Sequence, residues 1–168
     1  YIIDAAKNLK DSNIHDYLFI FCGFDMGNHN YVEKLINTYG LKDHVISFKF
    51  LTTLEIISLY KYCNAVVMPT YGGPTNLPIF ESFFFKKPIF YTSNLLKDKK
   101  ISNNLIEIDI LNINDFILKL QFLENKPFIK KLIDGAFEYY MNSCDEKLFQ
   151  ENYSKIFQDF EYLKSRWK

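Results

Sequence analysis

Residues 65–91 read A-V-V-M-P-T-Y-G-G-P-T-N-L-P-I-F-E-S-F-F-F-K-K-P-I-F-Y, and this stretch decides the fold. The apolar run Ala65–Met68 stops at a proline and predicts a short buried strand. A loop rich in glycine and proline follows, and after it a helix is predicted over Leu77–Phe85. Pro88–Tyr91 predicts the next strand. Strand, helix and strand in this order indicate two parallel strands joined by a right-handed crossover.

The same alternation extends in both directions along the chain. Further strands are predicted at Tyr17–Cys22, Val45–Phe48 and Leu105–Ile108, and the stretch Lys97–Asn104 is expected to be a flexible loop. Helices are predicted at Tyr1–Leu9, Tyr31–Tyr39, Leu54–Tyr62, Asn114–Leu123, Pro127–Tyr140 and Glu146–Arg166. We therefore expect an α/β fold: a Rossmann-like open parallel sheet with helices on both faces and extra C-terminal helices. An aromatic stripe in the last helix (Phe149, Tyr153, Phe157, Phe160 and Trp167) is expected to form a core or inter-domain face.

Composition excludes several classes of protein. The 168 residues suit a single domain over 1–168, and 20 Lys plus Arg balance 20 Asp plus Glu, whereas duplex binding calls for a basic excess. The three cysteines and three histidines lack metal-ligand spacing. We expect reduced thiols, no metal, no nucleic-acid partner and a cytoplasmic location. No apolar run reaches the roughly 18 residues that span a bilayer, so any membrane contact is expected to be peripheral, at the inner face.

The loop after Met68 is the candidate anion site. Pro78 lacks an N–H and fits only the first turn of a helix, so the helix must begin between about Pro74 and Leu77, with Thr75 or Asn76 as its N-cap. Free N–H groups and the positive end of the helix dipole there would suit a diphosphate. The competing interpretation is a well-capped helix without a ligand.

Glu81 lies one turn further along this helix. A carboxylate beside so much apolar surface needs hydrogen-bond donors if it is buried, and the vicinal diol of a ribose offers two. The competing interpretation is a carboxylate that complements the helix dipole and faces water. Gly23 ends the first apolar strand and would allow a tight turn near a ligand.

Several pieces, in the right order, resemble the retaining GT-B glycosyltransferases of group 1. The main one is V-V-M-P-T-Y-G-G-P-T-N-L-P-I-F-E-S-F-F-F-K-K-P-I-F, similar to a strand ending in P-S or P-T followed by E-G-x-G-L-P-x-x-E, a helix and G-x-P-V. Upstream, L-F-I-F-C-G resembles L-x-I-x-G, V-I-S-F-K-F resembles V-x-F-x-G, and L-E-I-I-S-L-Y-K-Y-C-N-A-V-V-M-P resembles L-x-x-L-Y-x-x-A-D-x-x-V-x-P. The likeness covers nearly the whole chain.

The resemblance implies specific roles. It aligns Glu81 with the family's second glutamate, which binds ribose, and Gly73 with the first, which contacts the donor hexose. Gly73-Pro74-Thr75-Asn76 therefore replaces E-G-x-G, so donor-sugar contacts would come from Thr75, Asn76 and backbone amides up to Leu77. Phe50 and Leu51 would lie near the base, although Lys49 stands where glycine is usual.

The resemblance also implies what the parent protein does. We expect transfer of a hexose from a nucleotide-sugar to a saccharide or lipid-linked acceptor, with retention, in polysaccharide biosynthesis. The chain is expected to be the donor-binding domain, without the N-terminal acceptor domain, the first strand and the basic pair that holds the diphosphate, and to be inactive alone. Two alternatives stay open: an inactive GT-B-like module that binds a nucleotide or a partner, and an epimerase of similar architecture.

Overall fold

The computed structural model describes residues 1–22, 27–72, 77–144 and 146–166. The strands in these ranges are β1 (Phe19–Phe21), β2 (Val45–Ser47), β3 (Val66–Met68), β4 (Ile89–Thr92) and β5 (Ile106–Ile108). All their pairings are parallel, so the predicted α/β class is confirmed. The described strands form two sheets, β1-β2 and β3-β4-β5, rather than one continuous sheet.

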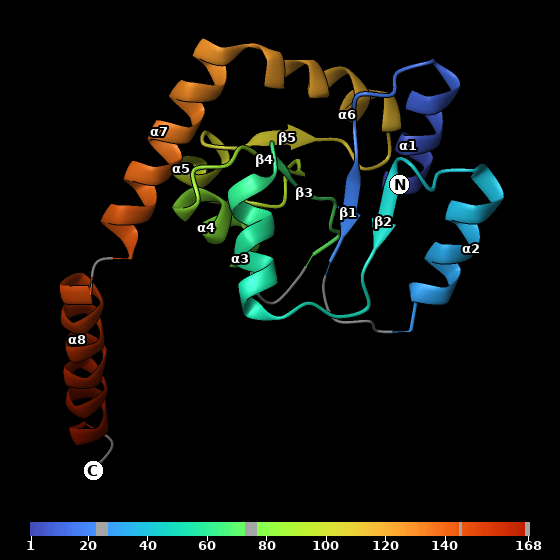
Figure 1. Cartoon of the computed structure of the whole chain (residues 1–168). Coiled ribbons are helices and arrows are strands. Elements are labelled where there is room, and N and C mark those ends of the chain that lie inside the picture. Colours follow the sequence, from blue (N-terminus) through green and yellow to red (C-terminus); the bar gives the residue numbers. More distant parts are fainter. Residues whose placement is uncertain (23–26, 73–76, 145, 167–168) are drawn as a thin grey trace.

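Helices connect the strands and follow them (Figure 1). They are α1 (Ile2–Asp11), α2 (His29–Tyr39), α3 (Thr53–Tyr62), α4 (Leu77–Phe84), α5 (Lys99–Ser102), α6 (Ile113–Leu120), the 3-10 helix η1 (Gln121–Glu124), α7 (Lys126–Ser143) and α8 (Glu146–Ser165). Each predicted helix is present, with its ends moved by a few residues. The prediction of a loop over Lys97–Asn104 was wrong, because Asp98 caps α5 by accepting a hydrogen bond from the N–H of Lys100.

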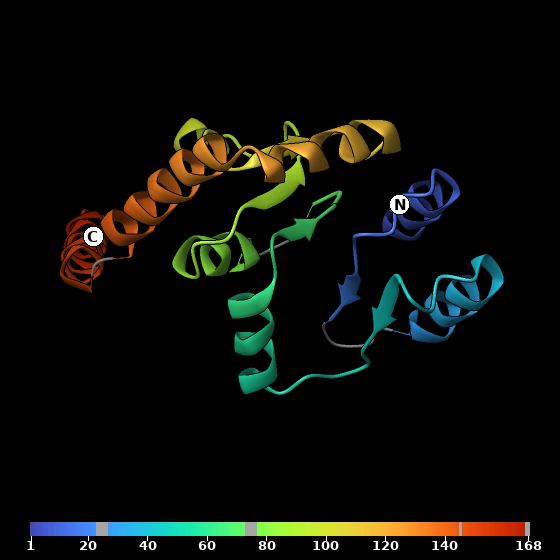
Figure 2. The same cartoon turned by 45° about the horizontal axis from the view of Figure 1, so that its top comes forward.

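Helices cover both faces of the β3-β4-β5 sheet and one face of the β1-β2 sheet, where Ile20 and Ile46 on the other face stay exposed (Figure 2). On one face, α1, α2 and α6 bury apolar side chains against β1, β2, β4 and β5, with Phe116 fully enclosed. On the other face, α4 and α7 pack on β4 through Ile79, Phe83 and Ala136. Every residue of β4 is buried because its side chains alternate between these two cores.

The helix α3 has no buried residue, in contrast to α1, α2 and α4. Its first turn is fixed by a capping box between Thr52 and Glu55. Its last turn is fixed by Lys87, whose Nζ donates to the carbonyl oxygens of Lys61 and Cys63 at 2.8 Å each. A lysine there also complements the negative end of the helix dipole.

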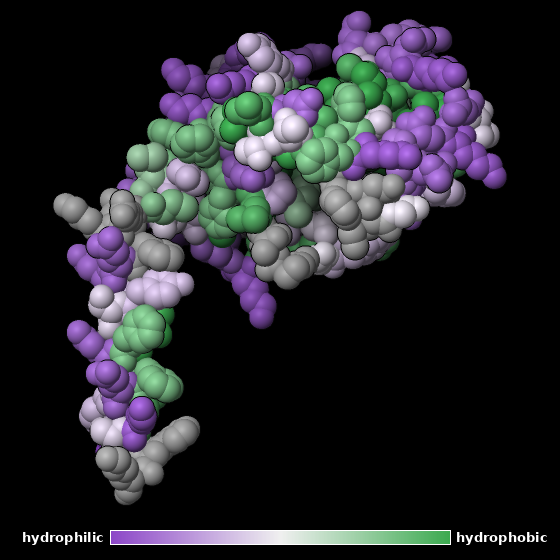
Figure 3. Space-filling model, turned by 60° about the horizontal axis from the view of Figure 1, so that its bottom comes forward, coloured by the Kyte–Doolittle hydropathy of each residue, from purple (hydrophilic) through white to green (hydrophobic). Residues whose placement is uncertain are grey.

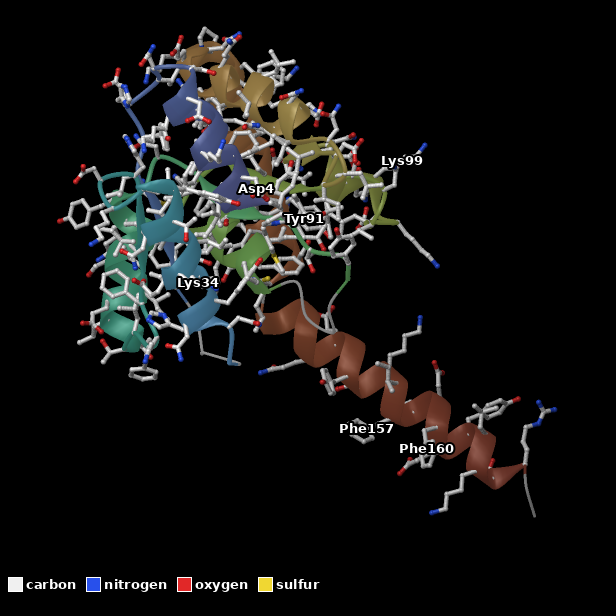
Figure 4. The ribbon with its side chains drawn as sticks, turned by 90° about the vertical axis from the view of Figure 1, so that its right-hand side faces the viewer. Asp4, Lys34, Tyr91, Lys99, Phe157 and Phe160 are labelled. Atoms are coloured by element: carbon white, nitrogen blue, oxygen red, sulfur yellow. The ribbon has the colours of Figure 1, made fainter. Side chains whose placement is uncertain are left out.

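The helix α8 projects from the body of the domain (Figure 1), and hydrophobic side chains run along one side of it (Figure 3). Figure 4 shows Phe157 and Phe160 together on that side. Their exposed fractions are 64% and 62%, and that of Tyr153 is 49%. Of the two alternatives for the aromatic stripe, a core face is therefore wrong for these residues, and an inter-domain face stays a prediction. Trp167 and the side chain of Phe149 lie outside the description.

Candidate functional site

The candidate site lies where the strands end. Figure 1 shows the chain leaving β1 and β2 at the same edge, as parallel strands require. The segments that follow β1, β2 and β3 begin at Cys22, Phe48 and Pro69. In open parallel sheets, ligands bind beyond this carboxyl edge, so these segments are the candidates for contact with a ligand.

Glu81 of α4, the helix that follows β3, is held by Tyr60 of α3. The Tyr60 hydroxyl donates a hydrogen bond of 2.7 Å to Oε2 of Glu81. The Tyr60 ring stacks on Phe85, with centroids 5.2 Å apart and planes 9° apart. The stack and the hydrogen bond fix the phenol from two sides, so it orients the carboxylate.

The protonation of Tyr60 favours this contact. Burial raises the pKa of the Tyr60 phenol well above its ordinary value, and the hydrogen bond to Glu81 raises it further. Tyr60 therefore stays a donor throughout the neutral range. An ionised carboxylate has two oxygens and about four acceptor positions, so one hydrogen bond from Tyr60 leaves Glu81 able to accept more.

Cys22 follows β1, and its thiol is influenced by the charge of Glu81. Neighbouring protein atoms desolvate its thiol and raise its pKa, and the charge of Glu81 raises that pKa further. Cys22 also contributes to the raised pKa of Tyr60. The helices α3 and α4 thus meet at Glu81, whose charge also acts on the thiol at the end of β1.

The loop after β3 is anchored at Thr70 by hydrogen bonds to Thr92. The N–H of Thr70 donates to Oγ1 of Thr92 at 2.9 Å, and the same hydroxyl donates to the carbonyl of Thr70 at 2.7 Å. Thr92 is buried at the end of β4. Two residues on, Gly72 has φ +150° and open space where a Cβ would lie, so a larger group could approach its backbone.

The sequence-predicted site residues divide into three groups. Leu77 begins α4, as predicted, with 59% of its side chain exposed. Phe50 is exposed and Leu51 half-buried in the segment before α3. The remaining predicted residues lie outside the described ranges: Gly23, Gly73, Pro74, Thr75 and Asn76.

Sequence reasoning missed the partner of Glu81. Tyr60 was predicted only to lie in the helix Leu54–Tyr62, since no spacing rule links a tyrosine to a carboxylate 21 residues later. A contact at the carboxyl edge of the β1-β2 sheet was also missed. His29, the first residue of α2, lies with its Nδ1 3.2 Å from Oγ of Ser47, the last residue of β2.

Glu81 also borders a groove between α4 and α7. The groove has a volume of about 460 Å³ and an apolar lining that includes Leu77, Phe80, Phe84 and Tyr140. Glu81 is thus an exposed carboxylate at the rim of a concave surface. Of the alternatives for Glu81, simple complementation of the helix dipole does not account for its hydrogen bond from another helix.

The described residues contain no group of three His, Cys, Asp or Glu side chains placed to hold a metal ion. Within the same ranges, no helix has the length and apolar character needed to cross a membrane.

Comparison with solved structures places the fold among glycosyltransferases. The chain resembles sucrose-phosphate synthase from Thermosynechococcus elongatus with a TM-score of 0.75 and 13% identity, over 96% of this chain and 42% of that one. It resembles a mutant of S. aureus TarM, in complex with fondaparinux, alpha-GlcNAc-glycerol and UDP, with a TM-score of 0.75 and 21% identity, over 93% and 32%.

A third solved structure covers a similar length of chain. It is the C-terminal domain of LpcC, a glycosyl transferase group 1 family protein from Francisella tularensis, with a TM-score of 0.67 and 19% identity over 84% of this chain and 76% of that one. The chain spans less than half of the first two proteins. At these identities the likeness establishes the fold.

Sequence comparison identifies the family. No curated protein sequence matches the chain. The family model described as "Glycosyl transferases group 1" matches residues 1–109, which contain β1 to β5, Tyr60 and Glu81. Because this match covers well over half of the sequence, the chain belongs to the group 1 glycosyl transferase family.

Proposed function

We propose that the chain is the donor-binding domain of a glycosyltransferase that moves a hexose from a nucleotide-sugar to an acceptor with retention of configuration. The observation that carries this proposal is the hydrogen-bonded Tyr60–Glu81 pair, inside the region that matches the family. In this role Glu81 accepts hydrogen bonds from the ribose hydroxyls of the donor, and Tyr60 keeps its carboxylate in position.

The start of α4 suits the chemistry of the leaving group. When the bond from the anomeric carbon breaks, negative charge develops on a nucleoside diphosphate. Backbone N–H groups and the positive dipole end at the start of α4 would stabilise that charge without a metal ion. In the solved TarM complex the bound nucleotide is UDP, which supports a nucleoside diphosphate as the leaving group here.

The acceptor follows from the family. We propose a saccharide or lipid-linked acceptor, bound by a second domain and used in polysaccharide biosynthesis at the cytoplasmic face of a membrane. The likeness to the C-terminal domain of LpcC supports the assignment of this chain to the donor half. The donor half alone should not turn over nucleotide-sugars.

The test is the substitution Glu81→Gln in the full-length protein. It keeps the size of the side chain and removes the charge that the ribose hydroxyls would contact. Hydrogen bonds to a charged group contribute about 1.5–3 kcal/mol, so affinity should fall by roughly 10-fold to 100-fold. Isothermal titration with UDP, GDP and ADP measures the loss, and transfer from the matching nucleotide-sugars is measured alongside.

The matched control is Glu161→Gln. Glu161 is an exposed glutamate on α8, away from the candidate site, and its substitution should leave affinity unchanged. Equal affinity of the wild type and Glu81→Gln for every nucleotide bound would refute the role of Glu81. Binding without any transfer would instead favour an inactive nucleotide-binding module.

A further inference from the structure

Two histidines and a tyrosine form a stack at the amino edge of the β1-β2 sheet. His15 lies in the connection from α1 to β1, and His44 is the residue directly before β2. Figure 1 shows both connections entering their strands at the same edge, opposite the carboxyl edge. The stack is therefore separate from the residues that the proposed function uses, and an inference about it goes beyond that function.

The imidazole of His44 contacts two other rings. It stacks on the ring of Tyr17, with centroids 4.8 Å apart and planes 21° apart. It also stacks on the ring of His15, with centroids 5.4 Å apart and the same angle between the planes. Backbone hydrogen bonds fix its position, since its N–H donates to Leu41 and its C=O accepts from Phe19 at the start of β1. The stack thus joins the entry to β1 with the entry to β2.

The two imidazoles share one hydrogen bond. Nδ1 of His15 and Nε2 of His44 are 3.4 Å apart, so one nitrogen must donate its N–H and the other must accept it. The second ring nitrogen of His44, Nδ1, is buried and has no hydrogen-bond partner among the described residues. A buried N–H without an acceptor costs free energy, so the surroundings of His44 do not suit N–H groups on both of its nitrogens.

This geometry limits the number of protons that the pair can hold. One added proton leaves one imidazole charged and the other neutral, and a charge-assisted hydrogen bond can join them. A second added proton gives each ring an N–H on both nitrogens, so two donors face each other at the contact. It also places two positive charges side by side and gives Nδ1 of His44 a buried N–H without an acceptor. The folded pair therefore holds at most one added proton.

Neighbouring charged groups do not compensate for a second charge. The titratable groups beside the stack in sequence or packing are Lys10 and Asp11 of α1, Asp16, Tyr17, Tyr39 of α2, Lys42 and Asp43. Among the described residues, no ion pair joins either histidine to a carboxylate. Lys10 donates to the carbonyls of Tyr39 and Gly40, and Asp11 pairs with Lys7. The Tyr17 hydroxyl donates to the carbonyl of Ala6, so Tyr17 offers His44 only the face of its ring.

We infer that His15, His44 and Tyr17 form an acid-sensitive clasp, which joins the entries to β1 and β2 at neutral pH and opens when both histidines are protonated. In an open chain each histidine takes up a proton as the pH falls through about 6.5, so the open clasp binds two protons where the closed clasp binds one. Stability rises with pH wherever the open state binds more protons. The clasp is therefore fully stable above about pH 6.5 and loses stability as the pH falls below it.

The test is amide hydrogen exchange of the full-length protein, measured by mass spectrometry at about pH 7.5 and about pH 5 and corrected for the intrinsic rate at each pH. One unmatched proton changes the equilibrium between open and closed clasp roughly 20-fold between these pH values. We expect peptides from residues 12–21 and 41–48 to open roughly 20-fold more at the lower pH in the wild type. His44→Gln removes one titrating ring and should abolish this increase.

The matched control is His29→Gln, because His29 contacts the hydroxyl of Ser47 rather than a second histidine. It should leave the acid-induced opening as it is in the wild type. If His44→Gln does not fold, His15→Gln takes its place, since His15 is exposed and its loss removes the second charge.

Two results would overturn the inference. One is an acid-induced opening of the same size in the wild type and in the folded His15 or His44 variant. The other comes from NMR titration of the histidine rings. The clasp predicts that His15 and His44 together take up one proton by about pH 5 while the amides around them remain protected. Two complete and independent ring titrations in the protected state would show that the two charges tolerate each other.

Discussion

Replacing Tyr60 with phenylalanine removes one hydroxyl group and keeps the ring that stacks on Phe85. The lost interaction is a hydrogen bond of 2.7 Å to a carboxylate, a class that contributes about 1.5–3 kcal/mol. Glu81 is exposed and can be partly rescued by water, so we expect a loss of about 1 kcal/mol, or roughly a fivefold weaker binding of the nucleoside diphosphate. Isothermal titration of Tyr60→Phe in the full-length protein measures this change.

A double-mutant cycle separates positioning of Glu81 from a general structural effect. If Tyr60 acts through Glu81, then Tyr60→Phe should change affinity much less in the Glu81→Gln background than in the wild type. Tyr62→Phe is the matched control, because it makes the same change on the same helix at a side chain that is 86% exposed. Unchanged affinity of Tyr60→Phe, or an equal loss for Tyr62→Phe, would refute the reasoning.

Two further predictions concern stability. Partial burial alone would raise the pKa of Asp115, but hydrogen bonds from Lys119 and a backbone N–H outweigh burial and lower that pKa below 3.8. The stabilisation that this carboxylate gives the folded state is therefore present above pH 3.8 and is lost as the pH falls through the lowered pKa. Asp115→Asn should therefore cost about 1 kcal/mol at pH 7 and nearly nothing at a pH below the lowered pKa, where both side chains are neutral. Urea unfolding that gives the same difference under both conditions would contradict this. Thr92→Val should cost about 1–3 kcal/mol, because both backbone groups of Thr70 lose their partner. Urea unfolding checks it, and a stability equal to that of the wild type would show that water replaces the hydroxyl.

The elements of the fold could be predicted because their signals are local. Short, largely apolar runs mark the strands, two of which end at Gly23 and Pro69, and Pro78 fixes the start of α4. The division into two sheets could not be predicted this way, because an apolar run has the same pattern whether one or both of its edges are paired. The exposure of Ile20 depends on which strands are neighbours, and this is decided by distant parts of the chain.

The site was predictable only in part, for a similar reason. A carboxylate one turn into a helix that follows a glycine-rich loop is visible in sequence, so Glu81 could be named. Its orientation depends on Tyr60, which reaches it from another helix through tertiary packing. Phe50 and Leu51 were placed near the base by resemblance alone, and that placement stays a prediction.

The hydroxyl of Thr92 has a consequence for how this domain can diverge. It ties the root of the loop after β3 to β4, the most enclosed strand of the molecule. Because the anchor lies at Thr70, before the loop proper, amino-acid changes beyond that point leave the anchor and the core of β4 intact. Related chains could therefore exchange one loop for another after Thr70 at little cost to folding.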